Sequence, residues 1–267
     1  MLSAPICLRV KGPFACFTRP EFHVERVSYP VITPSAARGI LEAILMKPIE
    51  KPEAAKRHNK IGFRWYILRL GIVRKGILIS ILRNELGYES HPAYGNSHGF
   101  DIMDKRTQRH SLILKDVEYL IEAVIGVDAR PRRPSEPFLL AKYHQMFLRR
   151  ARTGQCYYQP FLGCREFSVA EWELMTNVPD KIPDTPETED LGFIFRDFDF
   201  SPVWQHWGDE RNTPRPMDWT DPTDTRKVTA ADKYAVHPNA QHFPLHAKAV
   251  NGWISVSEIH DGNVMPA

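Results

Sequence analysis

The sequence predicts an α+β protein, with a ferredoxin-like (RNA-recognition-like) domain over residues 1–178 and a smaller β-rich C-terminal extension over residues 179–267. Two observations support this prediction. Apolar residues alternate or recur at helical spacing in the order strand, helix, strand, strand, helix, strand, which is the order of a ferredoxin-like unit. The formal charge also changes sign along the chain, which separates a basic part from an acidic part.

The first strand and the first helix are predicted from short local patterns. Residues 6–11 alternate, with two apolar residues on one face and Arg9 and Lys11 on the other, so basic side chains are expected on an open sheet face. Thr33 followed by proline is a favourable N-cap and first-turn pair for the helix that comes next. Residues 48–63 are mostly polar and are interpreted as an inserted loop or short solvated helix.

The rest of the N-terminal domain follows from runs of apolar residues. Residues 63–73 and 76–82 are both largely apolar, and the second run is short and bounded by glycine and asparagine, which favours a buried strand. Residues 112–127 give the best strand signal, because apolar residues alternate with glutamates. Residues 138–151 predict a helix that ends in arginines and stops before a glycine, and residues 165–175 predict one further strand.

The acidic, proline-rich segment 177–190 is interpreted as the boundary between the two parts. Beyond it, residues 192–200 and 247–259 predict strands, and residues 209–232 predict irregular structure. The extension is therefore expected to be a separate β-rich appendage.

The distribution of charge along the chain indicates which kind of partner the protein binds. Residues 1–166 carry 27 Lys and Arg against 15 Asp and Glu, whereas residues 167–267 carry 8 against 17. A basic part predicts a polyanion partner, because binding phosphates releases counterions, although a solvated basic face is the alternative. The acidic part is not expected to bind RNA.

Cysteine usage and hydropathy predict the compartment. The four cysteines form no C-x-x-C pair, and no apolar segment of signal-peptide type precedes them, which predicts reduced thiols in a cytoplasmic protein. The longest apolar run, residues 76–82, is too short to cross a bilayer, so no membrane partner is expected.

Three basic segments, 15–21, 25–39 and 149–167, are candidates for RNA contact. The second contains a helix N-terminus, whose free N–H groups and dipole suit a phosphate. In the third, arginines alternate with tyrosine and glutamine, a pattern suited to single-stranded RNA. For Phe17, core packing is an equal alternative to base contact. The predicted RNA contacts are Arg9, Lys11, Phe17, Thr18, Arg19, Arg26, Arg38, Arg149, Arg150, Arg152, Gln155, Tyr158, Gln159 and Arg165.

Several longer motifs carry a resemblance to a known family. They are Phe17-Thr-Arg-Pro-Glu21, the segment from Thr33 to Ala43, Arg83-Asn-Glu85, the segment from Arg149 to Gln155, and Leu162-Gly-Cys-Arg-Glu-Phe167. Together they resemble the CRISPR-associated Cas "five" family, subtype D, of type I-C systems, from about Leu8 to Phe200. The resemblance implies binding to the repeat-derived 5′ handle of crRNA and assembly with the backbone and large subunits of a Cascade-type complex.

The same resemblance implies a metal-independent endoribonuclease that cuts precursor crRNA and needs no cofactor. In such a reaction the adjacent ribose 2′-OH attacks the phosphate, so the site needs a base, an acid for the 5′-oxygen and a cation. The family's basic–His pair falls on Arg109 and His110, and its helix tyrosine falls on Leu45, which cannot move a proton.

Two questions stay open at the level of sequence. Tyr66, Tyr88 and Tyr94 are candidates for the missing phenol, and we take Tyr66 as the third catalytic residue beside Arg109 and His110. His110 is alternatively an RNA contact or a strand-cap residue. A non-catalytic, handle-binding structural subunit is therefore the alternative to an enzyme, and a generic RNA-recognition module outside CRISPR is a more remote one.

Overall fold

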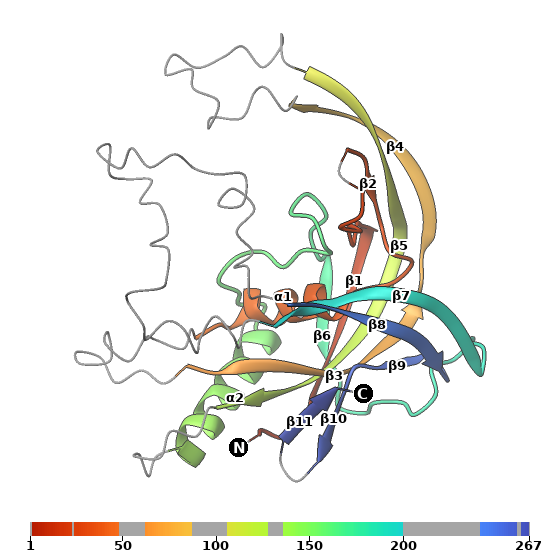
Figure 1. Cartoon of the computed structure of the whole chain (residues 1–267). Helices are drawn as coiled ribbons and strands as arrows, with labels where there is room; N and C mark the ends of the chain where they lie inside the picture. The colour runs from red at the N-terminus through yellow and green to blue at the C-terminus, as the bar shows by residue number, and fades with distance from the viewer. Residues whose placement is uncertain are drawn as a thin grey trace, which may run out of the picture.

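The computed structural model describes residues 2–22, 24–47, 62–86, 106–127, 136–199, 241–260 and 263–266. This part of the chain forms a nine-stranded, mostly antiparallel sheet, two helices and a separate β-hairpin (Figure 1). The helices are α1 (Pro34–Ile44) and α2 (Glu136–Arg152). The strands are β1 (Ile6–Ala15), β2 (Arg26–Val27), β3 (Arg64–Arg74), β4 (Ile77–Leu86), β5 (Arg106–Gly126), β6 (Glu171–Leu174), β7 (Thr188–Asp199), β8 (Gln241–Val250), β9 (Trp253–Ser255), β10 (Ser257–His260) and β11 (Asn263–Pro266).

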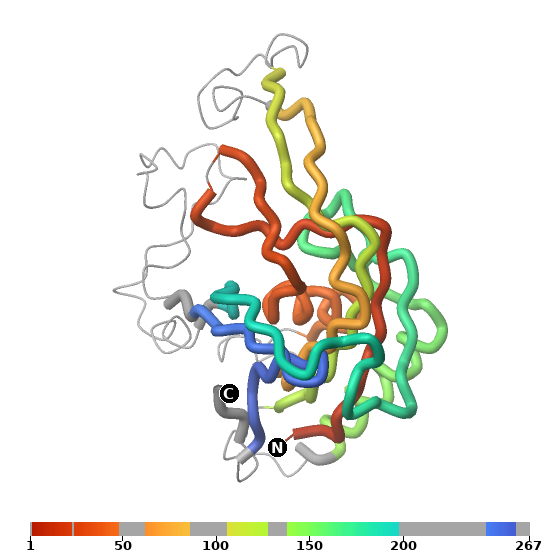
Figure 2. Tube along the Cα trace, turned by 90° about the vertical axis from the view of Figure 1, so that its right-hand side faces the viewer, coloured from red at the N-terminus to blue at the C-terminus, as the bar shows by residue number. Residues whose placement is uncertain are grey.

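The long strand β5 organises the sheet. The strand order is β6-β1-β5-β3-β9-β8-β7, and β2 and β4 also pair with β5. The second half of β5 lies between β1 and β3 in the body of the protein, whereas its first half pairs with β4. Strands β4 and β5 therefore continue past the body as a curved two-stranded arm, which extends upward in Figure 1 and Figure 2. We call this pair the β4–β5 arm.

Both helices begin or end where the sequence predicts. The Thr33 side chain accepts a hydrogen bond from the backbone N–H of Ala36, at 3.3 Å, which satisfies a free donor in the first turn of α1. Apolar residues of α1 are buried in the core. Helix α2 ends two residues before Gly154, which has a φ of +70° that glycine adopts without strain.

The two basic residues expected on an open face of the first strand are partly exposed, but both are paired with acidic side chains. Val117, Tyr119 and Ile121 are buried as the alternation of β5 predicts, but Glu118 between them is buried too. Its carboxylate accepts a hydrogen bond from Arg9 Nε at 2.6 Å, and Lys11 Nζ lies 3.7 Å from Glu171 Oε2. Acidic side chains on the neighbouring strands therefore neutralise the two cations expected to face RNA.

The apolar run at residues 76–82 is a strand, as predicted, but it is not buried. Ile77 is 69% exposed and Leu82 is 55% exposed. These residues belong to the β4–β5 arm, which extends beyond the two helices (Figure 1), whereas Ile79 and Ile81 of the same strand are partly buried against a small cluster around Cys16, Ile113 and Cys164. Apolar sequence alone does not show where the covering layer ends.

The acidic part of the chain packs against the basic part. Strand β9 pairs with β3, and β8 and β7 continue the same sheet. Ile194, Leu245 and Ile254 join the same hydrophobic core as β1, β3 and β5. The predicted division at residue 178 thus follows a change in charge and not a break in the core, and the expectation of a separate appendage is corrected.

Other predicted segments are placed only in part. The strand expected at residues 165–175 is confined to β6, and residues 160–168 form a loop that packs against β1. The strands expected at 192–200 and 247–259 correspond to β7 and to β8–β10. The predictions for residues 48–61 and 209–232 lie outside the described residues.

Candidate nucleic-acid interface

His110 lies on the β4–β5 arm with an exposed side chain. It pairs with Leu82 of β4, and its Nδ1 lies 3.4 Å from the hydroxyl of Ser80, which is on the same face. Arg109 precedes it on β5, and successive side chains of a strand point to opposite faces. Arg109 donates from Nη1 to the backbone carbonyl of Val24, at 3.1 Å. The structure therefore does not bring the predicted Arg109–His110 pair to one phosphate.

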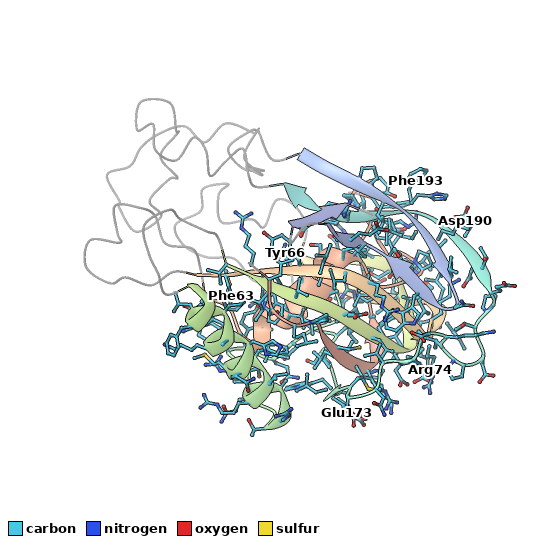
Figure 3. All side chains as sticks on the ribbon, turned by 90° about the horizontal axis from the view of Figure 1, so that it is seen from below. Phe63, Tyr66, Arg74, Glu173, Asp190 and Phe193 are labelled. Atoms are coloured by element: carbon cyan, nitrogen blue, oxygen red, sulfur yellow. The ribbon has the colours of Figure 1, made fainter. Side chains whose placement is uncertain are left out.

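Tyr66 lies at the other end of the sheet. It pairs with Val124, and the stretch of β5 from His110 to Val124 is about 45 Å long at the usual rise per residue. Its ring packs over Gly126, where a Cβ would lie 2.5 Å from Tyr66 Cε2. Figure 3 shows Tyr66 beside Phe63 at the start of β3, with Arg74 at the far end of that strand. The prediction that Tyr66 acts beside His110 is wrong, because strand register separates the two.

Leu45, at the position of the family's tyrosine, is buried at the C-terminal end of α1. Its side chain is fully covered, and its carbonyl accepts a hydrogen bond from Trp65 Nε1 at 3.0 Å. The neighbouring carbonyl of Ile44 accepts one from Arg150 Nη1 at 2.9 Å. Arg150, a predicted RNA contact, thus caps α1, where a cation also interacts favourably with the helix dipole.

The end of α2 carries the clearest exposed group of cations and aromatic rings. Arg149 and Arg152 are exposed, and neither forms an ion pair with another described residue. Tyr157 is 84% exposed and Tyr158 is 41% exposed, with ring centroids 6.0 Å apart. The backbone N–H of Tyr157 donates to Ala43 O of α1 at 2.7 Å, which fixes the loop against the helix. We call Arg149, Arg152 and Tyr157 the α2-end cluster.

The sequence prediction chose Tyr158 as an RNA contact, whereas Tyr157 is the more exposed of the two rings. The alternation of arginine, tyrosine and glutamine pointed to the segment, but it did not distinguish two adjacent tyrosines. Gln155 is exposed in the same loop, as expected for an RNA contact. The side-chain amide of Gln159 is held by a hydrogen bond to Val169 O, at 2.9 Å, so it stabilises the loop.

A network of arginines and acids lies on the Arg109 face of the arm. Arg83 forms ion pairs with Glu85, at 2.8 Å, and with Glu166 of the loop at residues 160–168. Burial raises the pKa of Glu166, but a backbone hydrogen bond and Arg83 lower it by more, so the net pKa lies below the usual value. Arg26 Nε lies 3.6 Å from Glu85 Oε1. The sequence motif Arg83-Asn-Glu85 was the signal that could have identified this network.

The remaining predicted contacts divide into exposed and packed residues. Thr18, Arg26 and Arg165 are exposed, and Arg19 lies 4.8 Å from the ring centroid of Tyr29. The prediction that Phe17 contacts RNA is wrong, because the ring is only 2% exposed and packs edge-on against Tyr119. The core-packing alternative for Phe17 is therefore the one observed.

Arg38 is also corrected as an RNA contact. Its guanidinium makes two hydrogen bonds to Asp197 of β7, at 2.7 and 3.0 Å, and one to Glu42 at 2.7 Å. This group ties α1 to the acidic part of the chain.

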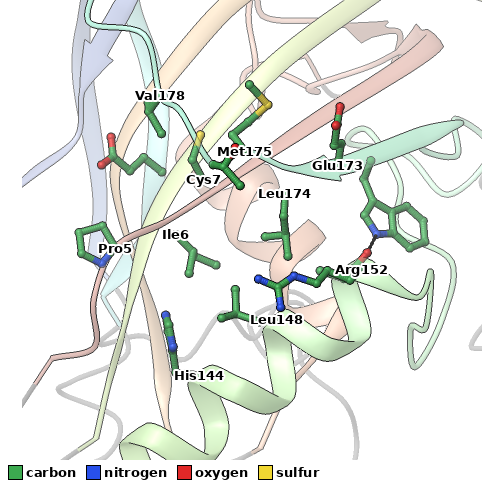
Figure 4. Close-up of a pocket in the computed structure, with 14 residues that line it drawn as sticks. Pro5, Ile6, Cys7, His144, Leu148, Arg152, Glu173, Leu174, Met175 and Val178 are labelled. Atoms are coloured by element: carbon green, nitrogen blue, oxygen red, sulfur yellow. Dashed lines mark hydrogen bonds between the residues drawn. The ribbon is translucent and has the colours of Figure 1, made fainter.

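A groove of about 440 Å³ lies between α2 and the edge of the sheet at β6 (Figure 4). Its lining includes His144, Leu148, Arg152 and Trp172. Burial lowers the pKa of His144, and the Nε2 atom of this residue has no hydrogen-bond partner in the described part of the chain. The groove was not predicted, because its residues come from four separate elements, β1, β5, α2 and β6.

Among the described residues, no three His, Cys, Asp or Glu side chains lie together in a way that could hold a metal ion. Neither described helix is long and apolar enough to cross a membrane.

Comparison with solved structures first defines the class of the fold. The chain resembles a structure titled "Crystal Structure of CRISPR-associated Protein", with a TM-score of 0.54 and 19% identity over 96% of this chain and 92% of the other. It also resembles a functionally uncharacterized protein from Streptococcus mutans, with a TM-score of 0.53 and 20% identity over 96% and 93% of the two chains. The fold is thus one found among CRISPR-associated proteins.

Comparison of sequences then gives the family. The family described as "CRISPR-associated protein (Cas_Cas5)", subtype Cas5d, matches residues 6–231. The chain is 41% identical to the CRISPR pre-crRNA endoribonuclease Cas5d of Thermus thermophilus over 198 residues, which cover 74% of each protein. It is 38% identical to the protein of the same name from Mannheimia succiniciproducens over 207 residues, covering 73% of this chain and 85% of the relative. The chain belongs to the Cas5d family, which confirms the resemblance seen in its motifs.

Proposed function

We propose that this chain is a CRISPR pre-crRNA endoribonuclease that cuts repeat RNA and then remains bound to the 5′ handle. The observation that carries the proposal is its 38–41% identity to two proteins named as pre-crRNA endoribonucleases, over about three quarters of the chain. By the family resemblance, the protein works in the cytoplasm of a type I-C system and joins the backbone and large subunits of a Cascade-type complex.

His110 is the residue best placed for proton transfer. Histidine is the side chain that most often acts as a general acid or base, and His110 presents its imidazole on an exposed face of the arm. Ser80 lies beside Nδ1, which leaves Nε2 for the RNA. In the proposed reaction the 2′-oxygen attacks phosphorus and the bond to the 5′-oxygen breaks, so the products carry a 2′,3′-cyclic phosphate and a 5′-hydroxyl. No metal or other cofactor is required in this scheme.

The α2-end cluster supports RNA binding. Arg149 and Arg152 offer charges to phosphates, and Tyr157 offers an exposed ring on which an unpaired base can stack. Arg109 has a structural part in this scheme, since it fastens the arm to the segment before β2 through Val24.

A non-catalytic, handle-binding subunit is the second candidate. It is favoured by the burial of Leu45 at the family's tyrosine position and by the separation of Tyr66 from His110. Neither residue can supply a phenol next to His110, and the other two candidates, Tyr88 and Tyr94, lie outside the described residues.

The scaffold in this proposal is a ferredoxin-like unit. Strands β6-β1-β5-β3 are neighbours in that order, α1 joins β1 to β3 through β2, and α2 joins β5 to β6. Strand order 4-1-3-2 with one helix after the first strand and another after the third is expected of such a unit. The β4–β5 arm and strands β7–β9 are additions to it.

The function is tested by incubating the purified protein with its own repeat RNA in EDTA. Wild-type protein should cut the RNA and leave a 2′,3′-cyclic phosphate, and His110→Ala should lower the single-turnover rate by about 100-fold or more. His144→Ala, on α2, and Tyr66→Phe are matched controls that should retain the rate. RNA binding without cleavage by wild-type protein would refute the enzyme and support the structural subunit.

A further inference from the structure

Two cysteines that are far apart in the sequence lie close together against one face of the β4–β5 arm. Cys16 follows β1, and Cys164 lies in the loop at residues 160–168. The backbone N–H of Cys16 donates to Leu162 O at 3.0 Å, and Cys164 Sγ lies 3.6 Å from Cys16 O. Gly163, with a φ of +88°, allows this approach, because a Cβ there would lie 2.0 Å from Cys16 O. The two segments are therefore in direct contact, which places the Cys164 side chain against Cys16.

The two sulfurs share polar neighbours in a buried setting. The hydroxyl of Thr18 lies 3.7 Å from each sulfur, and both cysteines are buried. Arg26 donates from Nη1 to Cys164 Sγ, at 3.3 Å. A hydrogen-bond donor and a guanidinium at one sulfur favour the thiolate there.

The charge environment gives the two thiols different reactivity. The pKa of Cys164 is lowered, mainly by a hydrogen bond from Cys16. Burial opposes this change, and Thr18 and Arg26 add to it. The same hydrogen bond, together with burial, raises the pKa of Cys16. Cys164 is thus the nucleophilic member of the pair, and Cys16 holds the proton.

Another buried cysteine lacks this arrangement. Burial and the nearby charge of Glu122 raise the pKa of Cys7 to about 12, although Arg69 opposes the change. A buried thiol with a raised pKa is a poor nucleophile, so Cys7 is a suitable internal control.

We propose that Cys16 and Cys164 form an oxidisable dithiol whose conversion to a disulfide by a peroxide releases Arg26 for phosphate binding. The Cys164 thiolate attacks one oxygen of hydrogen peroxide, the O–O bond breaks, and sulfenic acid and hydroxide form. The Cys16 sulfur then attacks the sulfenic sulfur, the S–O bond breaks, and the Cys16 proton leaves with the hydroxyl as water. Overall, two thiols are oxidised to one disulfide and one peroxide is reduced to two waters. The raised pKa of Cys16 does not block the second step, because the Cys164 negative charge is then gone.

The consequence for RNA binding rests on the proposed function. In the reduced state Arg26 is paired with the Cys164 sulfur and lies 3.6 Å from Glu85. Disulfide formation removes the thiolate charge, so the exposed side of Arg26 gains attraction for a phosphate. One partly exposed charge pair corresponds to about a twofold to fivefold change in affinity, so oxidised protein should bind repeat RNA about that much more tightly.

The covalent step is tested first on the full-length protein without RNA. The protein is treated with hydrogen peroxide, its remaining thiols are alkylated, and its peptides are mapped by mass spectrometry. We expect a Cys16–Cys164 disulfide that forms equally in Cys7→Ser and Cys156→Ser and is reversed by dithiothreitol. Oxidation of other cysteines while Cys16 and Cys164 remain free thiols overturns the proposal.

The effect on RNA is tested by measuring Kd for repeat RNA before and after peroxide. Cys164→Ser should bind about as tightly as oxidised wild-type protein and should not respond to peroxide, and Cys7→Ser should respond like wild type. A disulfide that forms without any change in Kd overturns the role of Arg26. If the reduced protein does not bind repeat RNA at all, the proposed function fails, and the mapping of the disulfide still decides the redox step.

Discussion

The ion pair between Arg38 and Asp197 offers the sharpest test of the structure against the sequence prediction. As an RNA contact, Arg38 should matter for binding, whereas the structure uses it to join α1 to β7. Its guanidinium makes a two-bond contact with the Asp197 carboxylate, and the two side chains are 27% and 30% exposed. Hydrogen bonds between charged groups contribute about 1.5–3 kcal/mol. We therefore expect a coupling free energy of about 2 kcal/mol.

The assay is a double-mutant cycle of Arg38→Met, Asp197→Asn and the double variant, followed by thermal and urea unfolding. Each single variant should unfold about 4–8 °C below wild type, given roughly 2–4 °C per kcal/mol in a protein of this size. The double variant should lose less than the sum of the single losses. Repeat-RNA binding by Arg38→Met, measured at a temperature where it is folded, should keep the salt dependence of wild type. Additive losses, or a weaker salt dependence in Arg38→Met, would refute the structural role.

Three further predictions concern RNA binding at the end of α2 and the pH dependence of stability. The double variant Arg149→Ala, Arg152→Ala should weaken repeat-RNA binding and reduce the slope of log K against log salt by about 0.7 per lost phosphate contact. Its Tm should stay within about 1 °C of wild type. An unchanged slope would show that these side chains are not part of the RNA interface. Tyr157→Ala should raise Kd about 5-fold to 100-fold if its ring stacks on a base, whereas Tyr157→Phe should bind as wild type does. Because folding lowers the pKa of His144, its imidazole binds a proton more readily in the unfolded chain than in the folded protein. The contribution of His144 to stability is therefore present above about pH 6.5 and is lost as the pH falls through the folded-state pKa. Urea unfolding of His144→Gln at pH 7.5 and pH 5.5 should show a smaller loss of stability at low pH than wild type, and an equal loss would contradict the assignment.

Much of the local structure and the family could be predicted from the sequence. Thr33 and the proline after it mark the start of α1, and the arginines before Gly154 mark the end of α2, because capping and turn preferences depend on a few neighbouring residues. The alternation along β5 identified its buried apolar face for the same reason. The motifs around Arg149 and Leu162 were long enough to indicate the family. The segment that carries the α2-end cluster was also found, although not its most exposed ring.

The tertiary structure alone decided which of these residues can act together. Strand register places Tyr66 far from His110, and strand pleating turns Arg109 away from it, although 109 and 110 are adjacent in sequence. Packing between elements brings Asp197 of β7 to Arg38 of α1 and buries Phe17 against Tyr119. It also brings Cys164 beside Cys16 and Arg26. A local pattern fixes the face on which a side chain lies, but the identity of its neighbour depends on contacts between segments that the chain brings together only when it folds.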